Sequence, residues 1–357
     1  MMSGKVTELS CTLEKTMLKH WLLCFLFYLV VHSSILPVAV AAEEPQTIRF
    51  LKTWGQQGDQ PGEFHFPIDI AINASDEIFV TDHLNDRVQK FDRAGKLLSQ
   101  FSVLPNPGGL ALDKQGNLIL SHILASGSSK HKIGDRISIY SPQGKLIRQW
   151  GKPGKGPGEF NCPGGIAVAD NGRIYIADQT NHRVQVFDPT GQFLFEWGKY
   201  GSQPGEFGGK ASPNSRVGGP QFLAFDSEGN LWTTEGANCR VQQFTAEGKL
   251  LNYWGTDADA RGGLGGYFSG FDGKPVKSLT GPIAVCIDQK DRLWISAVSG
   301  RVQQFSSAGK YLRGCGDQQG TAAGEFYAPH GMAFDSHGDL YVVDAYNHRI
   351  QKFAVGH

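Results

Sequence analysis

Histidine is the residue type in this chain with the most versatile chemistry, because imidazole transfers protons near neutral pH and binds zinc. Of the 11 histidines, three stand at positions that could cooperate. His330 lies in the run Pro329-His330-Gly331, His65 follows a Pro-Gly-Glu-Phe motif, and His122 ends a short apolar run. A catalytic zinc needs three protein ligands around one open coordination position. His330, His65 and His122 are therefore the candidate metal ligands of this sequence.

A basic segment offers a different chemistry, the binding of anions. Lys130, His131 and Lys132 are consecutive, and Arg136 follows shortly after them. The chain as a whole is balanced, with 34 Lys and Arg against 34 Asp and Glu. Nucleic-acid binding usually leaves a strong basic excess, so this composition argues against nucleic acid as a partner. An acidic peptide or a polysaccharide fits the local basic segment better.

A third pattern recurs along the chain, an acidic residue followed by an asparagine and then by an arginine. The guanidinium fork of arginine can bind a carboxylate together with backbone carbonyls, and asparagine suits a tight turn. Since an active site is normally built once, a group repeated in this way is expected to be architectural. Its copies are Asp82, Asn85 and Arg87; Asp178, Asn181 and Arg183; Glu235, Asn238 and Arg240; and Asp344, Asn347 and Arg349.

The recurrence of this arginine gives the number of structural units in the chain, and these units must position the side chains described above. Residues 157–197, one such unit, contain four short apolar runs separated by Asn-Gly and Pro-x-Gly turn signals, which is typical of a four-stranded antiparallel meander. Units of about 50 residues with four strands each are what a β-propeller requires. The sequence therefore predicts an all-β fold, a six-bladed β-propeller of four-stranded antiparallel blades. The arginines that open the third run of each unit are Arg87, Arg136, Arg183, Arg240, Arg301 and Arg349.

The ends of the chain indicate how the ring closes. The last unit stops after its third run, which ends at Phe353, whereas residues 47–54 match a fourth run and precede the first unit. We expect this N-terminal strand to pair with the last blade, because a closed ring leaves no open seam between first and last blades. Residues 47–357 should thus form one propeller domain.

Three insertions, residues 123–133, 208–219 and 256–280, lengthen particular loops. Each falls before the first strand of a blade or between its second and third strands, and these loops emerge on one side of the disc, here called the top face. Lengthened loops on one side of a rigid scaffold usually carry binding. The glycine-rich run 262–266 in the third insertion follows no dinucleotide-binding pattern, so we interpret it as a flexible loop.

Two segments, residues 178–187 and 344–353, resemble the sequence signature of NHL repeats, and the resemblance extends from Thr47 to the C-terminus. NHL propellers serve as sensor domains, as protein- or RNA-binding platforms and as the catalytic core of peptidyl-hydroxyglycine amidating lyase, so the resemblance implies the fold without choosing one function. In that lyase a Pro-His pair before the first strand recurs in several blades and supplies zinc ligands. This chain matches that pair once, at Pro329-His330.

Residues 1–42 precede the propeller and have the pattern of a secretory signal peptide. Lysines come first, an apolar stretch at 21–31 follows, and an Ala-x-Ala pattern ends at Ala42. Residues 43–46 would then be a short linker. The alternative is a signal anchor over residues 21–42, although Pro37 and polar residues interrupt it. We expect an exported protein that is periplasmic, attached to the cell surface or secreted, or membrane-anchored in the alternative.

These observations favour a non-enzymatic binding platform, a monomer without a cofactor that holds a protein, a peptide or a glycan on its top face. The alternative is a metal-dependent lyase or hydrolase that uses His330, His65 and His122 with zinc, or that binds calcium. The residues predicted to line the binding face are His65, His122, Lys130, His131, Lys132, Arg136 and His330.

Overall fold

The computed structural model describes residues 47–123, 134–213, 218–269 and 275–356, all within the compact unit Thr47–His357. The predicted leader at 1–42 and the linker at 43–46 lie outside the described residues. So do the predicted binding residues Lys130, His131 and Lys132. In the described part of the chain, no helix is long and apolar enough to cross a membrane.

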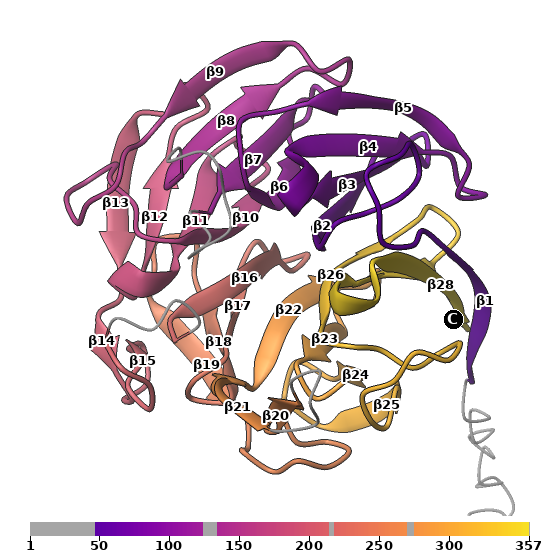
Figure 1. Ribbon diagram of the computed structural model, residues 1–357. Coiled ribbons are helices and arrows are strands. Elements are labelled where there is room, and N and C mark those ends of the chain that lie inside the picture. The colour runs from indigo at the N-terminus through magenta and orange to yellow at the C-terminus, as the bar shows by residue number, and fades with distance from the viewer. Residues whose placement is uncertain (1–46, 124–133, 214–217, 270–274, 357) are drawn as a thin grey trace, which may run out of the picture. The chain divides into compact units, whose positions relative to one another are not determined.

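The described chain forms six four-stranded antiparallel sheets, the blades, as the sequence predicted (Figure 1). Blades one to three contain β2 (Pro67–Ile72), β3 (Ile78–Asp82), β4 (Arg87–Phe91) and β5 (Leu97–Ser102); β6 (Pro107–Leu112), β7 (Leu118–His122), β8 (Arg136–Tyr140) and β9 (Leu146–Trp150); and β10 (Pro163–Val168), β11 (Ile174–Asp178), β12 (Arg183–Phe187) and β13 (Phe193–Trp197). Blades four to six contain β16 (Pro220–Phe225), β17 (Leu231–Glu235), β18 (Arg240–Phe244) and β19 (Leu250–Trp254); β22 (Pro282–Ile287), β23 (Leu293–Ala297), β24 (Arg301–Phe305) and β25 (Tyr311–Cys315); and β26 (Pro329–Phe334), β27 (Asp339–Asp344), β28 (Arg349–Val355) and β1 (Ile48–Trp54).

The first strands of the blades stand side by side in a closed ring. β2 contacts β6, the contacts continue through β10, β16, β22 and β26, and β26 contacts β2 again. Large side chains of the second strands, such as Trp232, Trp294 and Tyr175, are fully buried between neighbouring blades. Since both faces of each sheet are covered by its neighbours, the inner strands are largely buried, and polar residues such as Asp82, Asp178 and Gln185 are buried among their apolar side chains.

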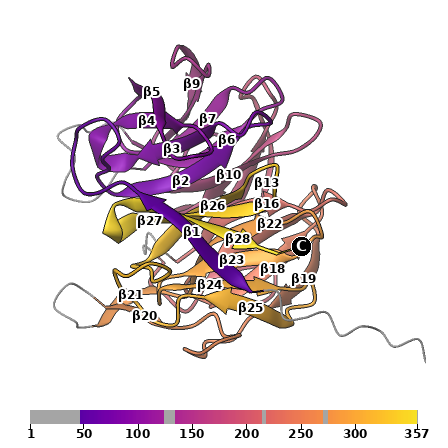
Figure 2. The same ribbon diagram turned by 90° about the vertical axis from the view of Figure 1, so that its right-hand side faces the viewer.

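The N-terminal strand closes the ring as predicted. β1 pairs antiparallel with β28, Ile48 opposite Val355 and Trp54 opposite Ile350 (Figure 2). The Trp54 ring then lies 6.0 Å from that of Phe91 in blade one. This strand therefore belongs to the last blade by hydrogen bonding and contacts the first blade by packing.

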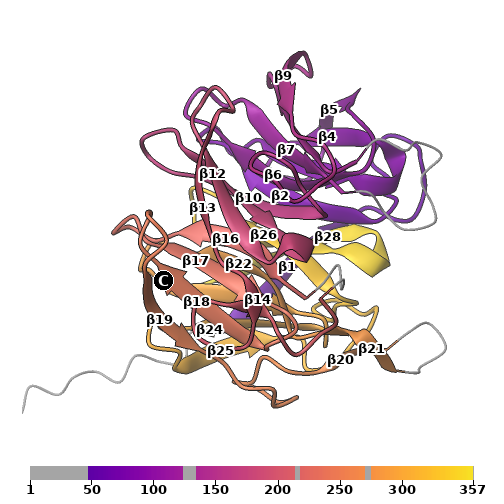
Figure 3. The same ribbon diagram turned by 90° about the vertical axis from the view of Figure 1, so that its left-hand side faces the viewer.

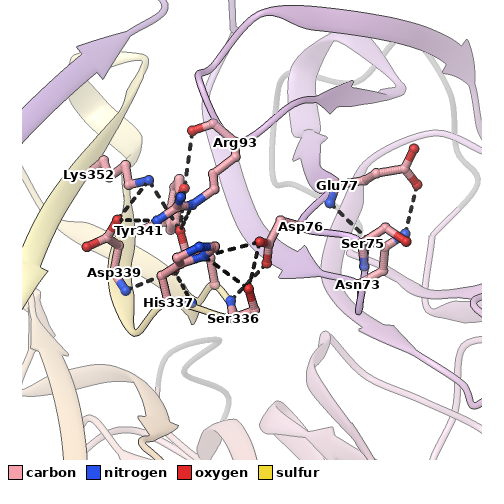
Figure 4. Close-up of polar contacts among 11 residues, drawn as sticks. Asn73, Ser75, Asp76, Glu77, Arg93, Ser336, His337, Asp339, Tyr341 and Lys352 are labelled. Atoms are coloured by element: carbon pink, nitrogen blue, oxygen red, sulfur yellow. Dashed lines mark hydrogen bonds and ion pairs between the residues drawn. The ribbon is translucent and has the colours of Figure 1, made fainter. Parts of the chain in front are cut away.

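Ion pairs fasten the same seam on the side opposite the top face (Figure 4). Arg93 of blade one binds Asp335 of blade six at 2.8 Å and Asp339 at 3.0 Å. In the neighbouring loops, the Ser336 hydroxyl donates to the Asp76 carboxylate at 2.8 Å. The first and last blades are thus joined by polar contacts as well as by β1.

The insertion at 256–280 adds a short hairpin to the top face, in which β20 (Tyr267–Ser269) pairs with β21 (Pro275–Thr280). The short pair of β14 (Tyr200–Gly201) and β15 (Phe207–Gly208) belongs instead to the Pro-Gly-Glu-Phe loop of blade four, as the bridge of Gln57 with Phe64 does in blade one. Figures 2 and 3 show the β20–β21 hairpin on the same side of the propeller as η3 (Ala345–Asn347), which links β27 to β28. The described additions therefore lie together on one face.

The interpretation of residues 262–266 as a flexible loop is wrong. Leu264 is fully buried, and its backbone N–H donates to the Thr256 carbonyl at 2.9 Å. The Gly262 N–H donates to the Gln303 side chain at 2.7 Å, as the Gly62 N–H does to Gln89 at 2.8 Å. The run is therefore the blade-five version of the Pro-Gly-Glu-Phe loop, with leucine in place of phenylalanine.

Candidate functional site

The repeated acid, asparagine and arginine form a closed structural unit, shown here by blade three. The Arg183 Nε donates to Asp178 at 2.9 Å, and its Nη1 donates to the Lys155 carbonyl at 2.8 Å and to Glu196 at 2.8 Å. Its Nη2 donates to the carbonyls of Gly156 and Glu159, each at 2.9 Å. All five guanidinium N–H donors are therefore used, which leaves none for a ligand.

The loop that carries these carbonyls is the Pro-Gly-Glu-Phe motif, here called the capping loop. It precedes the first strand of the blade and covers the start of the third. In blade three Phe160 is fully buried, and the Glu159 carboxylate accepts from the backbone N–H of Gly156 at 2.9 Å. The motif thus recurs because the Glu159 carbonyl accepts from the arginine, the Glu159 carboxylate closes the loop and the Phe160 ring anchors it.

A group of half-buried aromatic side chains occupies the top face where blades one and six meet. This aromatic patch consists of Phe66, Phe268, Tyr327, His330 and Tyr346. The ring centroids of Phe66 and Tyr346 are 4.8 Å apart, those of Phe66 and His330 are 5.6 Å apart, and those of Phe268 and Tyr346 are 4.5 Å apart. Phe268 is buried, whereas the other members of the patch are partly exposed. The patch therefore presents apolar surface to solvent.

Phe66 enters this patch from a strained backbone conformation. Its φ is +61°, a left-handed value that is uncommon for a bulky residue, and the residues before the first strands of blades two and three, Asn106 and Cys162, share the conformation with smaller side chains. The Phe66 N–H donates to Nδ1 of His348 at 3.0 Å. Strain of this kind persists only where surrounding contacts hold it, and it concentrates at functional sites.

Burial lowers the pKa of two histidines at the patch, His330 and His83. The His330 Nδ1–H donates to the Ala328 carbonyl at 2.8 Å, and burial lowers the pKa of this imidazole to about 4. His83, whose Nδ1 contacts the Pro107 carbonyl at 3.0 Å, also has its pKa lowered by burial. The patch is thus an aromatic surface with imidazole groups that form hydrogen bonds to backbone carbonyls.

The structure does not bring the three candidate zinc ligands together. His330 belongs to the patch, and His65 lies beside it, its ring 6.0 Å from that of His348. His122 is buried in blade two, where its Nδ1 contacts the Pro105 carbonyl at 3.0 Å and its Nε2 contacts the Ser138 hydroxyl at 2.6 Å. Among the described residues, no group of three or more His, Cys, Asp or Glu side chains could hold a metal ion.

Arg136, the remaining predicted site residue that is described, opens β8 and stands opposite His122 in the sheet register. Of the patch, sequence reasoning found only His330. A signal that could have found the other members is an aromatic residue shortly before the proline of a first strand, as at Phe66 and Tyr327, or in the turn before a third strand, as at Tyr346.

Fold and site together define a six-bladed β-propeller whose described additions and aromatic patch lie on one face. The family model for the NHL repeat matches residues 160–187 and 326–353, within blades three and six. The chain is an NHL-repeat β-propeller, as the sequence resemblance implied.

Known proteins are similar to this chain over different lengths. Protein brain tumor of Drosophila melanogaster is 30% identical over 132 residues, which cover 35% of this chain and 12% of that protein. The E3 ubiquitin-protein ligase TRIM32 of Mus musculus is 24% identical over 339 residues, which cover 88% of this chain and 45% of that protein. This chain thus spans less than half the length of these relatives.

Solved structures share the architecture. Virginiamycin B lyase of Staphylococcus aureus matches with a TM-score of 0.53 and 15% sequence identity, over 87% of this chain and 99% of that one. Propellers of one shape carry unrelated functions, so this likeness concerns the fold alone.

Proposed function

We propose that this protein is a binding platform that holds a protein, a peptide or a glycan on its top face, at the aromatic patch. The observation that carries the proposal is the meeting of partly exposed Phe66, Tyr346 and Tyr327 on the face that also carries the inserted loops. These side chains come from blades one and six, and buried Phe268 of β20 supports them. The relative TRIM32 is by name a ubiquitin-protein ligase, which supports a protein among the candidate ligands.

Aromatic side chains suit such a role for a physical reason. They cover a large apolar area while few rotatable bonds are fixed, and they dominate the energy of many interfaces. The neutral imidazole of His330 adds a polar group without a charge, since burial keeps its pKa near 4. A ligand with apolar or ring-shaped groups fits this surface best.

The test is a peptide and glycan array probed with the chain from residue 43 onward. Tyr346→Ala and Phe66→Ala remove patch rings, and Tyr253→Ala is the matched control because Tyr253 is 50% exposed on the outer strand β19. We expect at least a tenfold loss of binding with either patch variant and no change with the control. Equal binding by all three variants would overturn the proposal.

The zinc-dependent alternative makes a different measurable claim. It requires a metal bound through His330, which no observation on the described residues favours. Elemental analysis of protein purified without chelator or affinity tag separates the two functions. Stoichiometric zinc in the wild-type protein that is lost in His330→Ala would contradict the binding-platform proposal and support the metal-dependent function.

We further propose that the protein is exported and that residues 1–42 are removed. The support is the order of lysines, apolar stretch and small residues in that segment. N-terminal sequencing of protein recovered from outside the cytoplasm should begin at Glu43. Recovery of the same protein with Met1 in the membrane fraction would show a signal anchor instead.

A further inference from the structure

The six arginines that open the third strands differ in whether their charge is neutralised. In blade five Arg301 pairs at 2.5 Å with Asp259, a residue of the insertion. Arg136 of blade two forms no ion pair with any described residue. The remaining four bind the repeat carboxylate of their own blade: Arg87 to Asp82 at 2.7 Å, Arg183 to Asp178 at 2.9 Å, Arg240 to Glu235 at 2.6 Å and Arg349 to Asp344 at 2.7 Å.

Blade two has lost the whole clamp except its arginine. His122 takes the position of the acid, directly opposite Arg136. Ser138 takes the position of the glutamine that elsewhere donates to that acid, as Gln185 does to Asp178 at 3.0 Å. His122 and Ser138 bind each other at 2.6 Å, so neither compensates the guanidinium.

The capping loop that supplies backbone carbonyls in blade three is also missing. Residues 104–107 of blade two contain no Pro-Gly-Glu-Phe motif. The described contact of the Arg136 guanidinium is a long one, from Nη1 to the Gln149 side chain at 3.4 Å, and its Nε is buried without a hydrogen-bond partner. A buried cationic donor left unpaired is costly, and an external acceptor would relieve that cost.

No described carboxylate forms an ion pair with Arg136, and the sequence just before it contains few acids. Residues 124–133 contain neither aspartate nor glutamate, and their two lysines add positive charge to the sequence before Arg136. The nearest acid in the sequence, Asp135, accepts from the backbone N–H of Cys162 at 2.8 Å. Histidine does not substitute, because burial lowers the pKa of His122 to about 4 and keeps it neutral.

We propose that Arg136 is the receptor for a carboxylate of an external ligand, either an acidic side chain of a peptide or a small free carboxylate. The ligand oxygens take the place that the capping-loop carbonyls fill in blade three, and Arg136 is partly exposed. Arginine binds carboxylates through two parallel N–H donors, which gives both affinity and orientation. This inference rests on the proposed function and narrows the ligand of the same face to an acidic one.

The test uses a fluorescein-labelled peptide of six glutamates, with a six-glutamine peptide as its control, and fluorescence anisotropy at low salt. Arg136→Gln removes the receptor, and His122→Asp fills it with an internal carboxylate as in the other blades. Arg148→Gln is the matched control, since it removes one exposed positive charge from the same blade. We expect Arg136→Gln and His122→Asp to weaken binding at least tenfold and Arg148→Gln to change it less than twofold.

Other outcomes decide against the proposal. Equal losses of peptide affinity in Arg148→Gln and Arg136→Gln would show nonspecific charge attraction. Unchanged peptide affinity in Arg136→Gln would show that Arg136 is not the receptor. Tighter, Arg136-dependent binding of a single-stranded oligonucleotide would assign the site to phosphate. Competition by acetate identifies a free carboxylate as sufficient, whereas its failure identifies an acidic peptide.

The experiments can contradict the carboxylate inference without contradicting the binding-platform proposal. Thermal unfolding shows whether the His122→Asp variant is folded. If that variant does not fold, the binding measured with Arg136→Gln still decides the carboxylate inference. If the glutamate peptide does not bind while an array ligand is still lost with Tyr346→Ala, only the carboxylate inference falls.

Discussion

At the scale of single residues, the buried carboxyl group of Asp69 is the most unusual feature of the propeller centre. Its Oδ2 accepts from the Leu110 N–H at 2.7 Å and its Oδ1 from the Ile70 N–H at 2.8 Å. It fits because the facing residue of blade six is Gly331, where a Cβ would lie 2.1 Å from the Asp69 carboxylate. Burial nevertheless raises the pKa of Asp69 to about 7.

This raised pKa predicts a stability that falls as pH rises. The folded state holds the Asp69 proton up to about pH 7, whereas an aspartate in the unfolded chain loses it near 3.8. The stabilisation is therefore fully present below about pH 4 and is lost as pH rises through 7. Urea unfolding should show the wild-type free energy falling relative to Asp69→Asn by an amount on the order of a few kcal/mol between pH 4 and 7.

His330→Gln is the matched control, since it should show the opposite sign. Burial lowers the pKa of His330 from 6.5 to about 4, so its stabilisation is present above pH 6.5 and is lost as pH falls through 4. Glutamine occupies the equivalent position in blade four, at Gln221. Parallel pH profiles for wild type and Asp69→Asn would contradict the raised pKa.

At the scale of elements, the capping loop and its arginine clamp hold each blade together, and blade two provides an internal comparison. Arg183→Gln would leave Asp178 buried without its cation and would remove donors from the carbonyls of Gly156 and Glu159. We expect this variant to lower the free energy of unfolding by about 3–5 kcal/mol. Arg136→Gln should change it by less than about 0.5 kcal/mol in either direction, because no described carboxylate depends on Arg136 and its unpaired Nε contributes no hydrogen bond.

Chemical denaturation of both variants at pH 7 measures this difference directly. Equal losses would mean that Arg136 has a partner comparable to Asp178. The comparison also checks the unpaired state of Arg136 without any ligand.

The elements were predictable because their signals are local. Turn dipeptides and the repeated arginine mark each strand within a few residues, and each third strand begins at its predicted arginine. The blade-five capping loop was missed because Leu264 replaces the aromatic anchor and no glutamate accompanies it. In that loop, hydrogen bonds to backbone groups hold the capping-loop conformation although the Pro-Gly-Glu-Phe motif is absent.

The candidate site was less predictable, because it depends on contacts between distant segments. Phe66, Phe268 and Tyr346 meet only once the ring is closed and the β20–β21 hairpin is formed. The sequence indicated that His122 ends an apolar run, and the structure has it at the end of β7, but the sequence did not give the directions of the His122 and His330 rings. His122 contacts Ser138, which stands where blade three has Gln185, and this pairing depends on two residues from different strands.

At the scale of the whole propeller, stability depends on one seam. Blade six differs from the other five because it combines β1, from the start of the described chain, with β26, β27 and β28 from its end, and contacts such as Arg93 with Asp335 also join it to blade one. Trp54 lies at this junction, its ring 6.1 Å from Tyr341 of blade six and 6.0 Å from Phe91 of blade one.

A pair of truncations tests whether β1 closes the ring cooperatively. A chain that begins at Thr47 keeps β1 and should unfold in one transition, because all six blades retain four strands. A chain that begins at Gln56 exposes the edge of β28 and loses the Trp54 contacts, which alone are worth about 3 kcal/mol or more. Its melting temperature should fall by about 6 °C or more, and hydrogen exchange should quicken first in β28. Equal melting temperatures for the two chains would show that the ion pairs of the seam suffice and that β1 is only an appended strand.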